Sequence, residues 1–312
     1  MKIAVFPKGY LHELTVTRAM TVFDWIEMAR ALPVDGLELP SGVFPRQDDG
    51  YLDDVGAALD GAGFEMPMLC ASPDFTNPDQ EVRKREIERE AAMMRVSARL
   101  GGPRSYTRVL SGQRHPGVED EQGLDWATES ITGLLPLARE LDVTLTLENH
   151  YKASEWRYPE FAQRRASFLT LLDRIDDREH FGVQFDPSNA VVAGDDPVEL
   201  LRIVVDRVVS MQASDRSLAP GTTLEQLRGA DGTIGYSPAL QHGVLGEGLN
   251  DYAGIFTTLA GAGYDGWVSI EDGVNGMGDL VASADFLRAA REEFFGGSTA
   301  VSVRSHPRNR GR

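Results

Sequence analysis

Residues 143–148 read VTLTLE, a short run of β-branched and apolar residues that ends in a glutamate. Residues 182–186, GVQFD, repeat this pattern and end in an aspartate. Short apolar runs of this kind are typical of buried strands, and the segment between the two runs has helical character. A strand, a helix and a second strand in this order predict two parallel strands joined by a helical crossover.

The same unit recurs along the whole chain. Apolar or β-branched runs occur at 2–6, 36–39, 65–70, 105–110, 143–148, 182–186, 208–212 and 267–271. Eight strand–helix units in succession predict one closed (β/α)8 barrel, and no Gly/Ser-rich linker divides the chain. We therefore expect a single α/β domain over residues 1–295.

Helix boundaries are signalled between these runs. Asn77 followed by a proline predicts a helix start, and Gly101 predicts its end. Asp196, also followed by a proline, predicts a second start. Asn250 and Gly263 are expected to bracket a third helix.

Two segments do not fit the repeat. Residues 217–248 are rich in Gly and Leu without clear periodicity, and loops of this length are either functional lids and interface segments or disordered insertions. Residues 296–312 contain four Arg and no acidic residue, which predicts a basic, flexible C-terminal tail.

Charge and cysteine content exclude several classes of protein. The chain has 48 Asp and Glu against 31 Lys and Arg, a net charge of −17, which disfavours nucleic acid as a partner and favours a small molecule. No apolar run approaches the length of a secretory signal core or a bilayer span, so no membrane partner is expected. The single cysteine, Cys70, is consistent with a reducing cytoplasm.

Polar side chains end four consecutive predicted strands: Glu148, Asp186, Gln212 and Glu271. In a closed barrel these strand ends are neighbours at the rim where active sites form. Three carboxylates in one partly dry pocket repel each other unless a cation neutralises them. An all-oxygen set suits Mn²⁺ or Mg²⁺ better than Zn²⁺. The alternative is a structural acidic cluster held by arginine partners.

Several segments resemble one known family. LTLENH at 145–150, FGVQFDPSNA at 181–190, VVSMQASD at 208–215, and GVLGEGLNDYAGIF with YDGWVSIED at 243–256 and 264–272 look like the second half of the xylose isomerase-like TIM barrels, the sugar phosphate isomerase/epimerase superfamily. GLEL at 36–39 matches the second strand of that family. The resemblance implies a divalent metal held by Glu148, Asp186, Gln212 and Glu271, with Mn²⁺ favoured over Mg²⁺ or Co²⁺.

Two residues depart from the family pattern. Gln212 replaces the usual metal-binding histidine, and Asn189 replaces a histidine that often follows the aspartate. Gln212 can still bind a hard cation through its amide oxygen. Otherwise the metal has only three protein ligands.

The resemblance implies an enzyme that removes a proton next to the carbonyl of a keto-sugar, as an isomerase or epimerase. Glu148 and Glu271 on opposite sides of the substrate would remove and return the proton. His150 is a second candidate base, and its alternative role is that of a loop histidine making one hydrogen bond.

Substrate contacts are expected near the same strand ends. Asp215, Arg216, Asn189 and Lys152 are the predicted substrate-binding residues, and Lys8, Glu38 and Arg108 also lie at predicted strand ends. Trp156, Tyr151 and Tyr158 are candidates for an aromatic wall beside a sugar or a planar aglycone.

Other functions stay open on the sequence alone. The same first chemical step would serve the α subunit of a C-glycoside deglycosidase, a lyase that cleaves 3-oxo-C-glycosides and works with a small β subunit. A metal-free binding or scaffold subunit is a third possibility, whereas a phosphodiesterase of the apurinic endonuclease type needs more histidines and a basic surface. Barrels of this type commonly oligomerise, so a homo-oligomer or the hetero-oligomer is expected.

Overall fold

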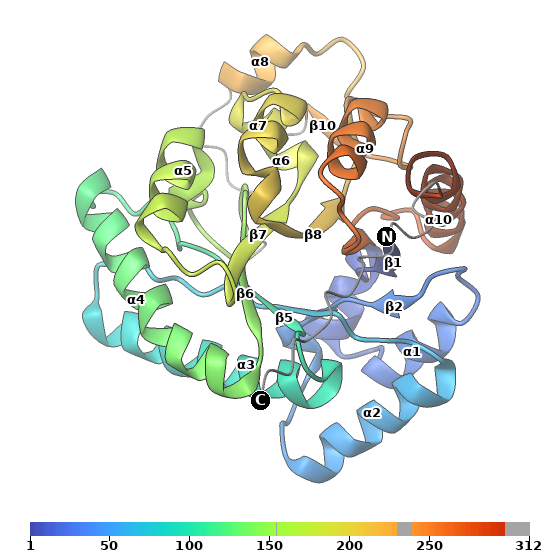
Figure 1. The fold of residues 1–312 in the computed structure, drawn as a ribbon, viewed down its shortest axis with the longest axis horizontal. Helices are drawn as coiled ribbons and strands as arrows, with labels where there is room; N and C mark the ends of the chain where they lie inside the picture. The colour runs from blue at the N-terminus through green and yellow to red at the C-terminus, as the bar shows by residue number, and fades with distance from the viewer. Residues whose placement is uncertain (154, 230–238, 297–312) are drawn as a thin grey trace, which may run out of the picture.

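The computed structural model describes residues 1–153, 155–229 and 239–296 (Figure 1). A parallel sheet curls into a barrel in the order β2-β1-β11-β8-β7-β6-β5-β4-β3. Its strands are β1 (Lys2–Val5), β2 (Gly36–Leu37), β3 (Leu39–Pro40), β4 (Met68–Cys70), β5 (Tyr106–Val109), β6 (Thr144–Glu148), β7 (Phe181–Phe185), β8 (Val208–Ala213) and β11 (Trp267–Ile270).

The barrel closes through the second predicted strand, which is divided in two. β2 pairs with β1, whereas β3 pairs with β4, and only Glu38 separates β2 from β3 in the chain. The nine short strands therefore correspond to the eight predicted runs, and the (β/α)8 TIM barrel is confirmed.

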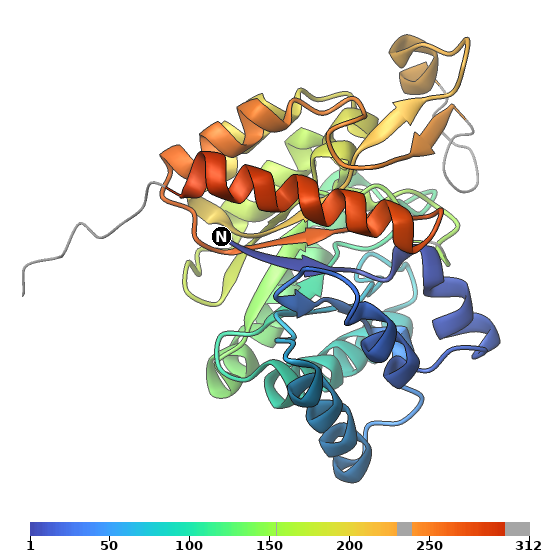
Figure 2. The ribbon, with the colours of Figure 1, turned by 90° about the vertical axis from the view of Figure 1, so that its right-hand side faces the viewer.

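Helices surround the barrel in chain order (Figures 1 and 2). They are α1 (Val22–Ala29), α2 (Asp49–Ala62), α3 (Gln80–Gly101), α4 (Asp120–Leu141), α5 (Arg165–Arg174), α6 (Pro187–Ala193), α7 (Pro197–Val204), α9 (Tyr252–Gly261) and α10 (Met277–Ala290). Their apolar faces pack against the outer surface of the sheet, which is why residues such as Val55, Ile131 and Leu201 are fully buried.

The predicted helix boundaries need small corrections. α3 is capped by Asp79 instead of Asn77, because the Asp79 carboxylate accepts from the backbone N–H of Glu81, and Gly102 with φ 69° ends it one residue later than predicted. Asp196 caps α7 as predicted. Asp251, the residue after the predicted Asn250, caps α9.

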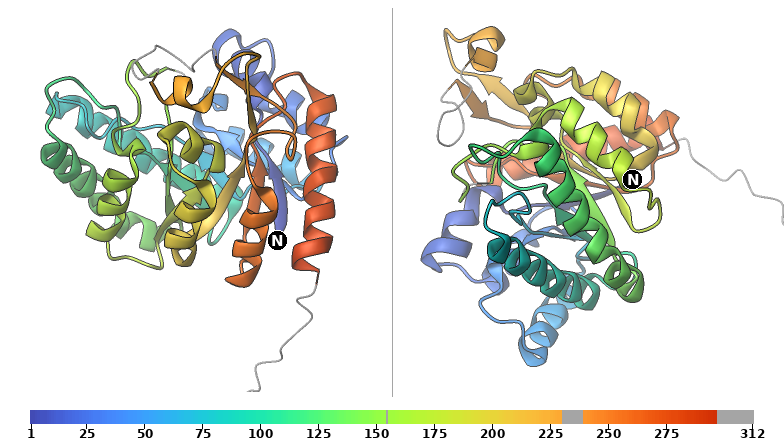
Figure 3. Two further views of the ribbon diagram at one scale, coloured as in Figure 1. Left: turned by 90° about the horizontal axis from the view of Figure 1, so that it is seen from above. Right: turned by 90° about the vertical axis from the view of Figure 1, so that its left-hand side faces the viewer.

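The long segment before the last strand forms a small excursion at one end of the barrel. β9 (Arg216–Leu218) and β10 (Leu240–His242) pair antiparallel, and α8 (Leu224–Gly229) follows β9. Figures 2 and 3 show these elements rising from the end opposite the N-terminus, where the strands end. Residues 230–238 of the segment, and 297–312 of the predicted tail, lie outside the described residues. Among the helices described, none is long and apolar enough to cross a membrane.

Candidate active site

The four polar residues predicted at strand ends share one rim of the barrel. Glu148 ends β6, Asp186 follows β7, Gln212 lies in β8 and Glu271 follows β11. These strands are consecutive neighbours in the sheet, and all four residues are at most 5% exposed. The structure therefore brings together the residues that the sequence singled out.

Basic side chains from other strands balance this acidic group. Arg108 of β5, itself buried, donates from Nη1 to Glu148 Oε2 at 2.7 Å. Lys8, which follows β1, donates from Nζ to Glu271 Oε1 at 2.9 Å. The neighbouring Asn189 donates from Nδ2 to Glu148 Oε1 at 3.0 Å, so both oxygens of Glu148 have partners.

The carboxylates at this rim differ in how readily they ionise. Burial raises the pKa of Glu148 in spite of the attraction of Arg108. Burial also opposes ionisation of Glu271, but Lys8 outweighs it and lowers the pKa of Glu271 to about 2. Burial, with repulsion from Glu271, raises the pKa of Asp186 well above its ordinary range. Repulsion from Glu271 contributes to the raised pKa of both Glu148 and Asp186, as expected for carboxylates that lie close together at this rim.

A hydrogen bond to Glu38 fixes the orientation of the Gln212 side-chain amide. The Gln212 amide donates from Nε2 to Glu38 Oε1 at 2.6 Å, and Gln184 and the Cys70 thiol donate to the same oxygen at 3.1 and 2.6 Å. Because Glu38 engages the amide nitrogen, the amide oxygen of Gln212 is left as an acceptor, and it is buried without a hydrogen-bond partner.

The donor atoms at this rim suit a hard divalent cation. Asp186 Oδ2 and Gln212 Oε1 are buried oxygens without partners, which is the state expected of ligand atoms that a cation completes. As they stand, the described side chains include no group of three or more His, Cys, Asp or Glu arranged around a metal position. Glu148 and Glu271 face their basic partners instead, so a cation would compete with Arg108 and Lys8 for these two glutamates.

His150 lies beside this group and is also buried. Its Nδ1 has no hydrogen-bond partner and lies 3.6 Å from Glu160 Oε2. Trp156 packs edge-on against the imidazole, with ring centroids 6.2 Å apart. Burial, together with repulsion from Arg108, lowers the pKa of His150 well below its ordinary value, so the ring is neutral at pH 7.

Glu160 was not anticipated from the sequence. Its Oε1 accepts from the backbone N–H and the hydroxyl of Ser111, while Oε2 faces His150. Burial raises the pKa of Glu160 to about 8. No motif marks this residue, because it belongs to an irregular segment that only the fold brings back to β6.

The predicted substrate-binding residues have different surroundings. Asn189 bridges the site, since Arg216 donates from Nη2 to its Oδ1 at 3.2 Å. Asp215 instead stabilises the segment before α9. Its carboxylate accepts hydrogen bonds from the backbone N–H groups of Gly246, Gly248 and Asn250. Lys152 is buried and donates to the carbonyl of Arg157 at 3.3 Å.

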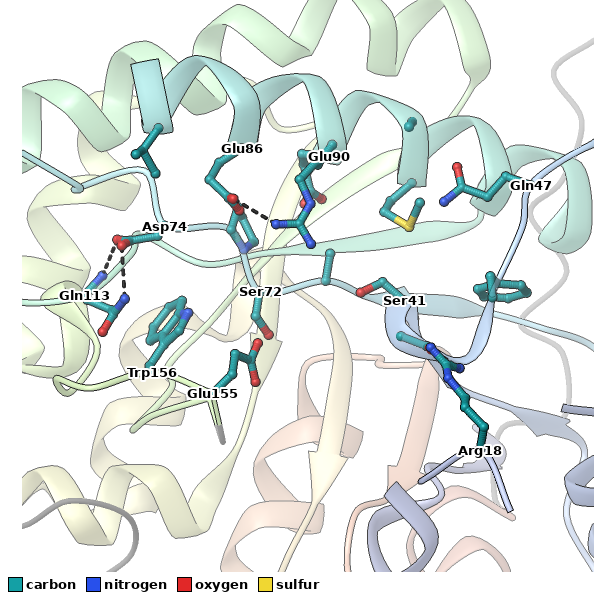
Figure 4. A pocket seen from close by; sticks show the side chains of 18 residues that line it. Arg18, Ser41, Gln47, Ser72, Asp74, Glu86, Glu90, Gln113, Glu155 and Trp156 are labelled. Atoms are coloured by element: carbon teal, nitrogen blue, oxygen red, sulfur yellow. Dashed lines mark hydrogen bonds and ion pairs between the residues drawn. The ribbon is translucent and has the colours of Figure 1, made fainter. Parts of the chain in front are cut away.

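A cavity of about 520 Å³ opens beside the rim (Figure 4). Residues of α3 and of the segments after β3, β4, β5 and β6 line it, including Trp156 but neither of the other two aromatic candidates, Tyr151 and Tyr158. Tyr158 packs edge-on against His115 instead. One lining residue, Glu90 of α3, is a buried carboxyl whose Oε1 has no hydrogen-bond partner.

The family model of the xylose isomerase-like TIM barrel matches residues 26–290. The chain belongs to this family. No curated protein matches it in sequence. Among solved structures, a D-tagatose 3-epimerase-like protein superimposes with a TM-score of 0.73 at 18% identity, covering 96% of this chain and 100% of its own.

Two further structures share the xylose isomerase-like fold. A xylose isomerase domain protein from Planctomyces limnophilus has a TM-score of 0.69 at 18% identity and covers 95% of this chain and 98% of its own. An IolI protein solved with a zinc atom has a TM-score of 0.70 at 14% identity and covers 96% and 100%. At these identities the likeness establishes the fold alone.

Glu90 makes the stability of this xylose isomerase-like barrel depend on pH. Burial raises its pKa from 4.5 to about 8, so the folded protein binds this proton more tightly than the unfolded chain does. The resulting stabilisation is complete below about pH 4.5 and is lost as the pH rises towards 8. Replacing Glu90 by a neutral side chain should therefore raise the free energy of unfolding at high pH, where the wild-type carboxyl is ionised.

We expect Glu90→Gln to unfold at higher urea concentration than the wild type at pH 8.5, but not at pH 4.5. The gain between the two pH values is at most about 5 kcal/mol, as the shift of the pKa implies. Glu88→Gln, on the exposed face of the same helix, is the matched control and should show no such difference. Equal pH dependence of the wild type and Glu90→Gln would contradict the assignment.

Proposed function

We propose that the protein is a sugar isomerase or epimerase that removes a proton from the carbon next to the carbonyl of a keto-sugar. The observation that carries the proposal is the grouping of Glu148, Glu271 and His150 in a buried pocket at the carboxyl ends of the strands. Sugar epimerases among the structures of the same fold support the reaction type.

Among these three residues, His150 is best suited to act as the base. Both oxygens of Glu148 already accept hydrogen bonds, and Glu271 is paired with Lys8. The imidazole is neutral, and its Nδ1 faces Glu160 Oε2 without a hydrogen-bond partner, so Nδ1 can carry the ring proton and leave Nε2 as the accepting nitrogen. When Nε2 accepts the substrate proton, the Nδ1–H faces Glu160 Oε2, and a small rotation would form the hydrogen bond that stabilises the charged ring.

The proposal includes a divalent cation, with Mn²⁺ favoured, held by the carboxylates of Glu148, Asp186 and Glu271 and by the amide oxygen of Gln212. Such an ion supplies positive charge for the oxygens of the enediolate. Arg108 and Lys8 pair with the two glutamates, so binding of the ion would require each glutamate to turn a carboxylate oxygen towards it, and both basic residues carry positive charge at the same rim. Asn189 and Arg216 are proposed to bind substrate hydroxyls.

The test measures hydrogen exchange in D₂O at the carbon that loses the proton. The protein is reconstituted with Mn²⁺, its bound ion is quantified, and NMR follows a free ketose and a 3-oxo-C-glycoside. Exchange in the ketose with one ion per chain is the expected result. A protein that binds no ion and exchanges neither compound would be a binding or scaffold subunit.

Release of a free aglycone from the 3-oxo-C-glycoside would instead identify the elimination reaction. In that reaction the same base removes the proton at C2, the C1–C2 double bond forms as the bond from C1 to the aglycone breaks, and the aglycone leaves with the bonding electron pair and takes up a proton. This outcome would assign the chain as the α subunit of a C-glycoside deglycosidase, and the small β subunit would be sought as its partner.

A further inference from the structure

The cavity in Figure 4 lies next to the proposed reaction centre, because Ser72 and Trp156 of its wall contact Arg108 and His150 of that centre. Its lining includes none of Glu148, Asp186, Gln212 or Glu271. Its volume of about 520 Å³ falls within the range of roughly 300–1,000 Å³ that is common for ligand pockets. A monosaccharide reacting at the carboxylates would leave this space to another group.

Two contacts join the cavity to the reaction centre. Ser72, on the cavity wall, accepts a hydrogen bond of 3.1 Å from Nη2 of Arg108, and the same guanidinium holds Glu148. Trp156, also on the wall, packs against His150. A substrate whose reacting carbon lies near Glu148 and His150 would therefore extend into the cavity past these side chains.

The wall combines apolar faces with an unsatisfied carboxyl. Trp156, Phe44 and Met93 supply apolar surface for one side of a ring. Glu90 is only 2% exposed and its Oε1 lacks a hydrogen-bond partner, which is unfavourable unless a ligand supplies one. The raised pKa of Glu90 keeps its carboxyl largely protonated at pH 7, so it can donate to a hydroxyl oxygen as well as accept.

We propose that this cavity binds a hydroxyl-bearing ring joined to the keto-sugar, so that the substrate is a glycoside and not a free monosaccharide. The inference rests on the proposed function for the reaction at the sugar. A phenol and a second sugar both offer the required chemistry, an apolar ring face with a hydroxyl at its edge. The probes must therefore include one of each.

The experiment compares four compounds with one reacting unit: 3-oxo-glucose, its methyl glycoside, its 4-hydroxyphenyl glycoside and a 3-oxo-glucosyl-glucose. Affinity is measured by titration calorimetry, and proton exchange is followed separately by NMR. We expect at least one of the two ring-bearing compounds to bind tenfold or more tightly than the methyl glycoside. The preferred compound distinguishes a phenolic aglycone from a second sugar.

Variants at two positions connect this preference to the cavity. Ala92→Trp fills the cavity from α3 and should remove the tenfold preference, and Glu90→Ala should reduce it while Glu90→Gln restores most of it. Glu88→Gln, on the outer face of α3, is the matched control and should keep the preference. Circular dichroism and thermal unfolding establish that each variant is folded.

The outcomes separate this inference from the proposed function. Equal affinity for all four compounds, or a preference that persists in folded Ala92→Trp, would overturn the inference even if every compound exchanges its proton. If no compound exchanges but the ring-bearing ones bind in a manner that depends on Glu90, the cavity assignment holds and the proposed reaction fails.

Discussion

Glu148→Ala is expected to lower the free energy of unfolding by about 3–5 kcal/mol and to abolish proton exchange and Mn²⁺ binding. The loss of stability has a defined cause, since Arg108 is buried and its guanidinium donates to Glu148 Oε2. Removal of the carboxylate leaves a buried charge without its principal partner. Asn189 loses its acceptor as well. Urea unfolding at pH 7 measures the change.

A surface pair supplies the matched control for this prediction. Glu65 accepts from Lys2 at 2.6 Å, but both side chains are half exposed or more, so Glu65→Ala should cost no more than about 1 kcal/mol. The double variant Glu148→Met/Arg108→Met removes both buried charges, and it should recover much of the lost stability but none of the activity. Equal destabilisation by Glu148→Ala and Glu65→Ala would contradict the buried ion pair.

The barrel was predictable because its signal is local and repeated. Each apolar run, such as 143–148 or 182–186, indicates a strand that is buried on both faces. The helical segments between the runs indicate that consecutive strands are parallel. The division of one strand around Glu38 was not predictable, because it depends on how the sheet closes. The β9–β10 pair was also missed, since its two short strands lie far apart in a segment without periodicity.

The carboxylates of the site could be predicted from the sequence because each of them ends or directly follows a predicted strand. Glu148 and Asp186 end adjacent parallel strands, so their proximity follows from topology alone. The basic partners could not be assigned, because Arg108 and Lys8 meet the glutamates across the rim only when the barrel is closed. Glu90 had a visible signal, as it falls on the apolar face of its helix between Ile87 and Met94.

His150→Ala is expected to lower the rate of proton exchange by about 10²–10⁴-fold while the bound Mn²⁺ and the substrate affinity stay unchanged. The reason is that the imidazole is the proposed base and accepts the proton at Nε2, whereas the carboxylates proposed for the ion remain in place. Single-turnover exchange by NMR, metal analysis and calorimetric titration measure the three quantities separately.

His180→Ala is the control for the loss of a buried imidazole. His180 is also buried, but its Nδ1 contacts the carbonyl of Val143 at the opposite end of the barrel, so its removal should affect stability and leave exchange intact. The exchange rate of Glu160→Gln should fall between those of His150→Ala and His180→Ala, because glutamine keeps an acceptor for Ser111 and removes only the carboxyl that faces His150. If His150→Ala exchanges protons at the wild-type rate, the base is one of the two glutamates. Glu271, the one held ionised by Lys8, is then the residue to replace.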